Sequence, residues 1–195
     1  MHKLLPIFHV LSKFNLLFAL LTLLPAVVSQ LYGDGTLPAF ALTALVLTVW
    51  SLVMRFLTYR HQRELKPRDG FTLVVLLWLM FAAAAAMPFY LYFYPTLKFT
   101  DAFFEAMSGL TTTGATVFNH LDSLAPALNF WRHMLNWLGG MGLIVLAVAV
   151  LPMLGVGGTQ LFKAEIPGIQ KDNKTAPRIS QTAKRLWLVY LGFTV

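Results

Sequence analysis

Four long and nearly uncharged apolar runs limit what this chain can fold into. They cover residues 14–32, 37–57, 71–94 and 134–162, and a fifth run begins at residue 186. A helix of about 20 residues crosses the roughly 30 Å hydrocarbon core of a membrane, so each of the four runs is long enough to span it. Charged residues make up only 12% of the chain, about half the share in a soluble domain. We therefore predict an all-α integral membrane protein.

The distribution of the basic residues predicts how the chain is oriented. Its net charge is +7, which by itself is compatible with a nucleic-acid or membrane-surface partner. If the N-terminus is cytoplasmic and the spans alternate, 13 of the 15 Lys and Arg residues fall inside, and only Lys98 and Arg132 fall outside. This bias follows the positive-inside rule. The charge therefore indicates a multi-pass protein with a cytoplasmic N-terminus, and no nucleic-acid partner.

The first run has an alternative interpretation as a cleaved signal peptide. Lys3 and Lys13 precede it, and Val27-Val28-Ser29 loosely resembles a signal-peptidase site. The apolar run continues beyond that site to residue 32, so we favour a retained helix. The chain has no cysteine, which excludes disulfide frameworks, thiolate zinc sites and cysteine nucleophiles.

Residues 100–120 fit neither a membrane span nor an ordinary loop. Thr100 and Asp101 are expected to begin a helix, with a capping hydroxyl and then an acid near the positive end of the helix. Apolar residues recur at helical spacing up to Leu110, and a Thr-Thr-Thr-Gly-Ala-Thr run follows at 111–116. A short helix followed by extended backbone is typical of a re-entrant segment. Non-helical backbone at membrane depth must face protein or water, so this segment should line a cavity.

The chemistry of this segment indicates a filter for a monovalent cation. A glycine permits backbone angles that let successive carbonyl groups point the same way. Rings of carbonyl oxygens replace the hydration shell of a dehydrated alkali cation. The negative C-terminal end of the short helix would favour a cation in the cavity below it.

Several charged and aromatic residues near this segment have two interpretations. Asp101 and Glu105 are four residues apart on the short helix. They could form an acidic outer vestibule that concentrates cations, or Asp101 could cap the helix while Glu105 is a buried partner of a neighbouring amide. Arg132 and His133 are expected to extend to the lipid headgroups. Trp131 is expected to belong to an outer aromatic belt.

Catalysis and metal binding are the alternatives from other functional classes. Ser108 and Gly109 mimic the Ser-Gly pair of intramembrane serine proteases, with His133 on the next helix. An activated serine needs a base within hydrogen-bond reach, and this alternative leaves the Thr-Thr-Gly run unexplained. The histidines are scattered, without the spacing of a metal site on one helix face. We therefore expect no enzyme activity, no catalytic residues and no bound cofactor.

Four motifs together resemble one family of transporters. Residues 101–116 (DAFFEAMSGLTTTGAT) closely resemble the first pore segment of the Trk/Ktr/HKT superfamily of potassium transporters. Residues 137–143 (WLGGMGL) and 151–158 (LPMLGVGG) look like the following helix of its bacterial TrkH branch. Residues 171–179 (KDNKTAPRI) look like the cytoplasmic loop of that branch. The resemblance covers essentially the whole chain.

The resemblance implies part of a larger pore. A complete member carries four helix–pore-helix–filter–helix repeats around a central pathway, and this chain would hold two peripheral transmembrane helices, one repeat and the start of the next. The expected parts are the two N-terminal helices at 1–58, a cytoplasmic basic loop at 59–70, the pore repeat at 71–155, a cytoplasmic loop at 156–185 and the next helix at 186–195. One repeat cannot surround an ion, so we expect a truncated gene product or an artificially shortened chain.

The resemblance also implies residue roles and partners. Thr112 and Thr113 would supply filter oxygens for K⁺, and Gly114 would be the filter glycine, which goes with potassium preference in this family, whereas serine in some plant relatives goes with sodium. The implied partners are membrane lipid, the remaining pore repeats, a second copy in a homodimer and a cytoplasmic, nucleotide-binding, TrkA-like regulatory subunit. The implied location is the bacterial inner membrane. The alternative is an isolated membrane fragment with no transport activity of its own.

Overall fold

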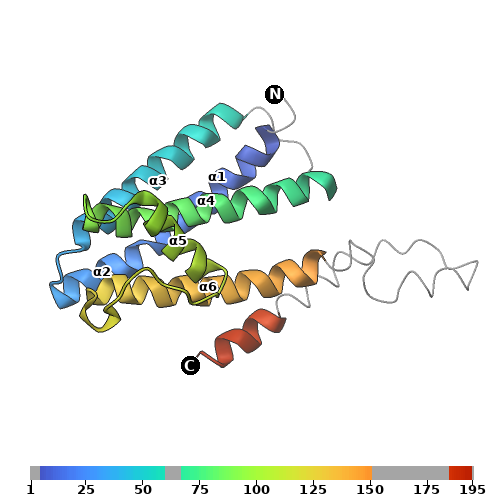
Figure 1. Ribbon diagram of the computed structural model, residues 1–195. Helices are drawn as coiled ribbons and strands as arrows, with labels where there is room; N and C mark the ends of the chain where they lie inside the picture. Colours follow the sequence, from blue (N-terminus) through green and yellow to red (C-terminus); the bar gives the residue numbers. More distant parts are fainter. Residues whose placement is uncertain (1–4, 60–66, 151–184, 195) are drawn as a thin grey trace, which may run out of the picture. The chain divides into compact units, whose positions relative to one another are not determined.

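Helices account for all regular secondary structure in the part of the chain that the structure describes. This computed structural model describes residues 5–59, 67–150 and 185–194. Its elements are α1 (Leu5–Leu21), α2 (Leu23–Tyr32), α3 (Leu37–Thr58), α4 (Pro67–Phe93), α5 (Phe99–Leu110), a 3-10 turn η1 (Leu121–Ser123) and α6 (Pro126–Val150), as Figure 1 shows. Residues 185–192 are also helical. The prediction of an all-α fold is confirmed.

Within the described residues, three helices are long and apolar enough to cross a membrane. They are Leu5–Tyr32, which joins α1 and α2, Leu37–Thr58 and Asp69–Phe93. These helices correspond to the first three apolar runs. The fourth run begins within α6, and its residues from 151 onward lie outside the described part. The cytoplasmic loop predicted at 156–185 also lies outside it, apart from residue 185. Of the basic loop predicted at 59–70, residues 60–66 lie outside it.

The first apolar run is broken where the sequence led us to expect one helix. Proline lacks a backbone N–H, and its ring clashes with the carbonyl group four residues earlier, so Pro25 cannot continue a regular turn from Leu21. Helix α1 ends at Leu21 and α2 begins at Leu23. The intervening Thr22 is buried, and its hydroxyl donates a hydrogen bond to the Ala19 carbonyl at 2.7 Å. The buried Thr22 hydroxyl at the break between α1 and α2 is therefore hydrogen-bonded.

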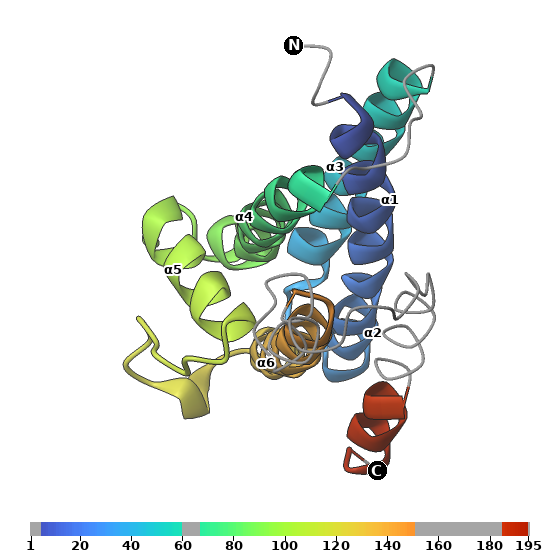
Figure 2. The same cartoon turned by 90° about the vertical axis from the view of Figure 1, so that its right-hand side faces the viewer.

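Trp131 lies in the core rather than in an aromatic belt, so that prediction was wrong. Its side chain is fully buried, and its indole N–H donates to the Ala85 carbonyl at 3.0 Å. The ring lies edge-on to Phe18 and Phe40, with centroid distances of 5.7 and 6.0 Å. Small side chains at 82–86 leave space beside α4 for the indole. In Figure 2, α4 lies between α5 and the α1–α3 pair.

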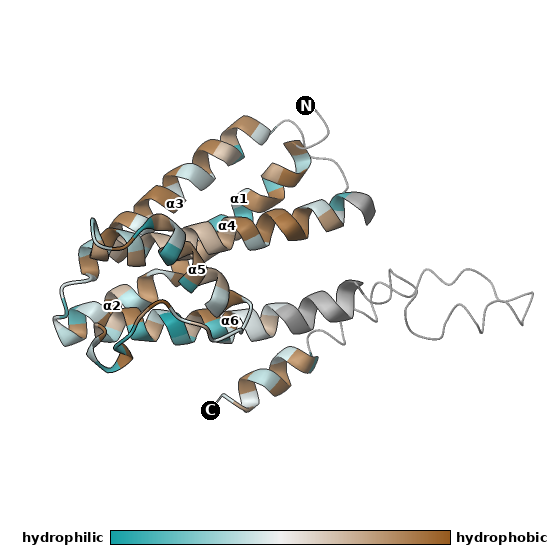
Figure 3. Ribbon diagram, in the orientation of Figure 1, coloured by the Kyte–Doolittle hydropathy of each residue, from teal (hydrophilic) through white to brown (hydrophobic). Residues whose placement is uncertain are grey.

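The outward faces of the long helices are apolar. Figure 3 shows hydrophobic residues along α1, α3 and α4, with polar residues concentrated near the helix ends and in the loops. Large exposed apolar side chains on these helices include Leu17, Leu45, Phe56 and Val75. A contiguous apolar surface of this kind needs an apolar environment, which a lipid bilayer provides.

Asp34 connects the end of α2 and the beginning of α3 to the start of α6. One carboxylate oxygen accepts hydrogen bonds from the Ser29 hydroxyl and from the hydroxyl and N–H of Thr36, at 2.6, 2.8 and 3.0 Å. The other oxygen accepts the N–H of Ala127 at 2.8 Å. That N–H is in the first turn of α6 and has no acceptor within the helix. Asp34 therefore acts as an N-cap supplied from a distant part of the chain.

We expect Asp34→Asn to lower the thermal stability of the purified chain. Burial alone raises the pKa of Asp34, but the bonds from Ser29, Ala127 and Thr36 outweigh this effect and hold the pKa below its ordinary value of 3.8. The charged carboxylate should therefore stabilise the fold fully above that pH, and the contribution should be lost as the pH falls below it. The substitution should cost about 1–3 kcal/mol at neutral pH. The measurement is the melting temperature as a function of pH.

The control for this prediction is Asp122→Asn, because Asp122 is an exposed aspartate in η1. It should leave the melting temperature unchanged. If both variants melt like the parent chain, Asp34 does not hold the start of α6.

Residues from Trp137 onward form a separate compact unit. Within it, the Tyr190 hydroxyl donates to the Trp137 carbonyl, and the Trp137 indole N–H donates to the Thr194 hydroxyl, both at 3.0 Å. A Cβ atom at Gly140 would lie 2.8 Å from the Tyr190 hydroxyl oxygen. Glycine at this position therefore lets the helix at 185–192 approach the second half of α6.

Candidate functional site

Helix α5 ends where the predicted filter segment begins. It starts at Phe99, after the extended residue Lys98, whose carbonyl accepts the N–H groups of Asp101 and Ala102 at 3.1 Å each. Thr100 and Asp101 lie in the first turn, and no side chain caps the helix among the residues described. The prediction that these two residues form the cap was wrong, because the extended backbone at Lys98 starts the helix earlier.

Residues 111–116 reverse the chain direction through unusual backbone conformations. Thr112 has a φ of 56° and Gly114 a φ of 75°. This left-handed region costs a residue with a side chain roughly 1–2 kcal/mol, whereas glycine adopts it freely. Two backbone hydrogen bonds hold the first part of the turn: Thr112 N–H donates to the Gly109 carbonyl and Thr113 N–H to the Ser108 carbonyl, both at 2.9 Å.

The three predicted filter residues, Thr112, Thr113 and Gly114, all lie in this turn and are exposed. In the described part of the chain, their backbone carbonyl groups accept no hydrogen bond, whereas the carbonyl of Ala115 does. The hydroxyls of Thr111 and Thr113 lie 2.9 Å apart. The turn thus combines three unpaired carbonyl oxygens with threonine hydroxyls.

Ser108 holds the segment after the turn against α5. Its side chain is buried, and its hydroxyl donates a hydrogen bond to the Ala115 carbonyl at 2.6 Å. A hydroxyl has one hydrogen to donate, so this one is not shared with a base such as His133. The Ser108 geometry therefore gives the protease alternative no support.

Glu105 is buried beside the same segment, residues 115–117. Its side chain is 2% exposed, and one oxygen accepts hydrogen bonds from the Thr116 hydroxyl at 2.9 Å and from the Val117 N–H at 3.0 Å. The other oxygen forms an ion pair with the Arg132 guanidinium of α6. Glu105 is therefore the buried partner of a neighbouring amide, as one of the two interpretations predicted, and not an exposed vestibule acid.

The sequence-based prediction for Arg132 was wrong. We expected it to extend to the headgroups, but its side chain is 12% exposed and pairs with Glu105. Glu105 and Arg132 are 27 residues apart. No helical periodicity links such distant positions, so the spacing did not predict this ion pair. The only indication in the sequence was that both charged residues lie in strongly apolar surroundings, where charges are usually paired.

A glycine permits the close contact that this pairing needs. A Cβ atom at Gly109 would lie 3.0 Å from Cβ of Leu135 on α6. The absence of a side chain thus lets the end of α5 approach α6. We call Glu105, Ser108 and Arg132 the anchor, because these side chains hold residues 115–117 from behind while 112–114 stay exposed.

A family model described as "TrkH: Cation transport protein" matches residues 36–195. A curated relative from Vibrio parahaemolyticus, "Trk system potassium uptake protein TrkH", is 51% identical over 179 residues, which are 92% of this chain and 37% of the relative. The Escherichia coli protein of the same name is 50% identical over 180 residues, again 92% and 37%. Escherichia coli "Trk system potassium uptake protein TrkG" is 41% identical over 174 residues, 89% of this chain and 36% of that protein.

A solved structure has the same fold. The crystal structure of the potassium transporter TrkH from Vibrio parahaemolyticus matches with a TM-score of 0.80 and 43% identity, over 97% of this chain and 37% of that one. This chain therefore spans a little over a third of the length of the relatives that it matches. The names of these relatives describe transporters and not enzymes.

Proposed function

The chain belongs to the TrkH family of cation transport proteins, and from this premise we propose that it forms the N-terminal part of a potassium uptake protein. Thr112, Thr113 and Gly114 supply one of four segments of a carbonyl-lined filter for K⁺. The relatives named above are described as potassium uptake proteins, which supports K⁺ as the transported ion.

The observation that carries this proposal is the difference in hydrogen bonding between residues 112–114 and residues 115–117. Glu105 and Ser108 provide hydrogen-bond partners for residues 115–117, whereas residues 112–114 are exposed and their carbonyls accept no hydrogen bond within the described residues. An unpaired carbonyl at membrane depth costs free energy unless water, protein or a cation satisfies it. A partly dehydrated K⁺ ion, surrounded by four such segments, provides this partner.

The anchor suits a filter because it fixes backbone geometry. The left-handed conformation at Thr112 is costly, so the backbone keeps it only where the surrounding structure holds it. The ion pair between Glu105 and Arg132 connects the segment to α6, and Ser108 connects it to α5. A filter that selects by ion coordination needs its oxygens held in place in this way.

Further parts of the proposal concern orientation, domains and partners. The N-terminus is cytoplasmic, and the protein crosses the bacterial inner membrane with the filter segment on the outer side. The pore repeat covers 71–155, after two peripheral helices. A homodimer and a TrkA-like nucleotide-binding subunit on the cytoplasmic side complete the proposed assembly. Positive charge in the loops predicted to be cytoplasmic supports this orientation.

The experiment is complementation of a strain that lacks potassium uptake. In a chimera, this chain replaces the matching N-terminal part of the Vibrio parahaemolyticus relative, to which it is 51% identical. We expect the chimera to restore growth at low K⁺, and the 195-residue chain alone not to restore it, because it contains one Thr-Thr-Gly segment. A chimera that reaches the membrane and does not take up K⁺ would contradict the proposed function.

A further inference from the structure

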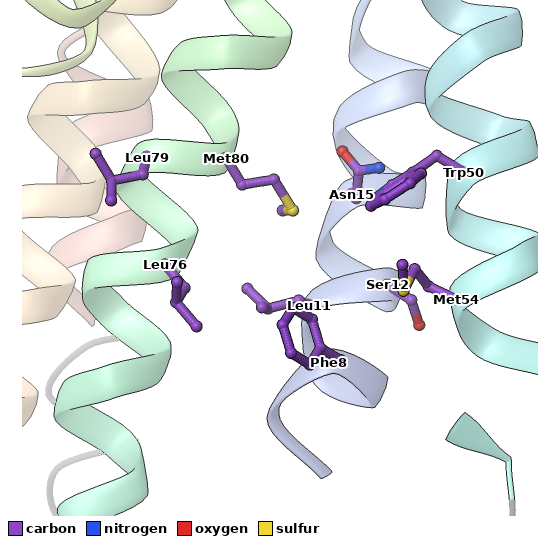
Figure 4. A pocket seen from close by; sticks show the side chains of 9 residues that line it. All are labelled: Phe8, Leu11, Ser12, Asn15, Trp50, Met54, Leu76, Leu79 and Met80. Atoms are coloured by element: carbon purple, nitrogen blue, oxygen red, sulfur yellow. The ribbon is translucent and has the colours of Figure 1, made fainter. Parts of the chain in front are cut away.

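The cavity between α1, α3 and α4 is almost entirely apolar. It has a volume of about 290 Å³, and seven of its nine lining side chains are apolar, as Figure 4 shows. The Ser12 hydroxyl donates to the His9 carbonyl at 2.7 Å. The Asn15 Nδ2 donates to the Ser51 hydroxyl oxygen at 3.0 Å, and its Oδ1 is buried. Nothing in the structure identifies an occupant for this cavity, so no ligand is assigned to it.

The first half of the turn at 111–116 carries side-chain contacts with a defined direction. The side chains of the anchor bond to residues 115–117, which follow the left-handed residue Thr112. A residue with a side chain keeps a left-handed conformation only where the surrounding structure holds it. Contacts nearer to Thr112 are therefore needed as well.

Two threonine hydroxyls on either side of Thr112 form a chain of hydrogen bonds. The Thr111 hydroxyl donates to the Met107 carbonyl, in the last turn of α5, at 2.8 Å. The hydroxyl oxygens of Thr111 and Thr113 lie 2.9 Å apart. A hydroxyl has one hydrogen and a carbonyl can only accept, so Thr113 is the donor in this second bond. The chain therefore runs from Thr113 through Thr111 to α5 and bridges Thr112.

This chain supports two backbone hydrogen bonds of the same turn. The N–H groups of residues 112 and 113 donate to the carbonyls of Gly109 and Ser108, both at 2.9 Å. Residues 111–113 are exposed, so water competes for both bonds. We propose that Thr111 is a positioning residue, whose hydroxyl keeps Thr112 left-handed and so sets the direction of the carbonyls at 112–114. Its effect on ion selection rests on the proposed function, whereas its effect on the backbone does not.

The effect on the backbone is tested by amide hydrogen exchange in the purified chain. Thr111→Val removes the hydroxyl and keeps the shape of the side chain, and Thr113→Val removes only the bond between the two hydroxyls. In both variants the amides of residues 112 and 113 should lose about threefold to tenfold of their protection, as the loss of one hydrogen bond gives. Thr111→Ser retains the hydroxyl and should keep the protection of the parent chain.

Thr96→Val is the matched control. The exposed Thr96 hydroxyl donates to the Phe93 carbonyl at the end of α4, so this variant removes a bond of the same kind in another turn. It should leave the exchange of the amides at 112 and 113 unchanged. The double variant Thr111→Val/Thr113→Val should lose no more protection than Thr111→Val alone, because both substitutions remove the same shared bond.

The effect on ion selection is measured with the same variants in the chimera. Thr111→Val and Thr113→Val should lower the ratio of K⁺ to Na⁺ uptake by about threefold to tenfold, and Thr111→Ser should keep it. A general loss of folded protein would lower the uptake of both ions and leave their ratio unchanged.

Two results would overturn the proposal. One is parent-like protection of the amides at 112 and 113 in Thr111→Val and Thr113→Val. The other is lost protection together with a parent-like ratio in a chimera that takes up K⁺. If the parent chimera takes up no K⁺, the proposed function fails, and the amide measurement still decides whether Thr111 holds the turn.

Discussion

Potassium uptake by the chimera should fall at least tenfold when Glu105 is replaced by glutamine. The substitution leaves the part-buried Arg132 guanidinium without a counter-charge and weakens the acceptor for Thr116 and Val117. Breaking a buried ion pair by removing one partner costs about 3–5 kcal/mol, which is a large share of the stability of a domain. Residues 115–117 would lose their connection to α6, and the carbonyls of the proposed filter residues 112–114 would lose their fixed positions. The measurement is the initial rate of Rb⁺ or K⁺ uptake, corrected for the amount of protein in the membrane.

Asp101→Asn provides the matched control for this substitution. Asp101 is one turn earlier on α5 and forms no ion pair in the described part of the chain. The control should keep uptake within about twofold of the parent chimera. Replacing Glu105 and Arg132 together by glutamine should recover part of the lost stability, because no unpaired charge remains. Parent-like uptake and a parent-like melting temperature in Glu105→Gln would show that the ion pair does not hold the filter segment.

The helices and the turn at 111–116 were largely predictable because their signals are local. Long uncharged runs indicated the membrane helices, and the helical spacing of apolar residues before a Thr-Gly run indicated α5 and the turn after it. The break at Thr22 was less clear, since proline is tolerated in many membrane helices and the consequence of Pro25 depends on packing.

The anchor and the core were not predictable, because they depend on contacts between distant residues. Arg132 and Trp131 are neighbours near the start of α6, and both looked like residues of the outer membrane surface. The fold instead turns both toward neighbouring helices: Trp131 is buried beside the alanines of α4, and the part-buried Arg132 pairs with Glu105. Which face of α6 points inward is decided by α4 and α5, and one isolated helix carries little information about its neighbours.

The second large effect is expected at Gly114. We expect Gly114→Ser in the chimera to lower the selectivity for K⁺ over Na⁺ by about tenfold. Space is not the reason, since no atom lies within 4 Å of a Cβ built at this position. The reason is the φ of 75°, which a residue with a side chain adopts at a cost of roughly 1–2 kcal/mol. That cost favours a different backbone conformation, in which the carbonyls of Thr113 and Gly114 no longer point as the filter requires.

Gly35 offers a matched control for this substitution. It has a φ of 77° and, like Gly114, no atom within 4 Å of a built Cβ. Gly35→Ser should therefore impose the same backbone strain in a loop between α2 and α3, away from the filter. A loss of selectivity in both variants would indicate general destabilisation rather than a role for Gly114 in ion coordination.

The ratio of K⁺ to Na⁺ uptake in the Gly114→Ser chimera, measured beside Gly35→Ser and the parent, tests most directly whether residues 112–114 coordinate the ion. The proposed filter predicts a ratio lowered about tenfold in Gly114→Ser and unchanged in Gly35→Ser. A Gly114→Ser chimera that reaches the membrane, takes up K⁺ and keeps the parent ratio would contradict the assignment of these residues to the filter.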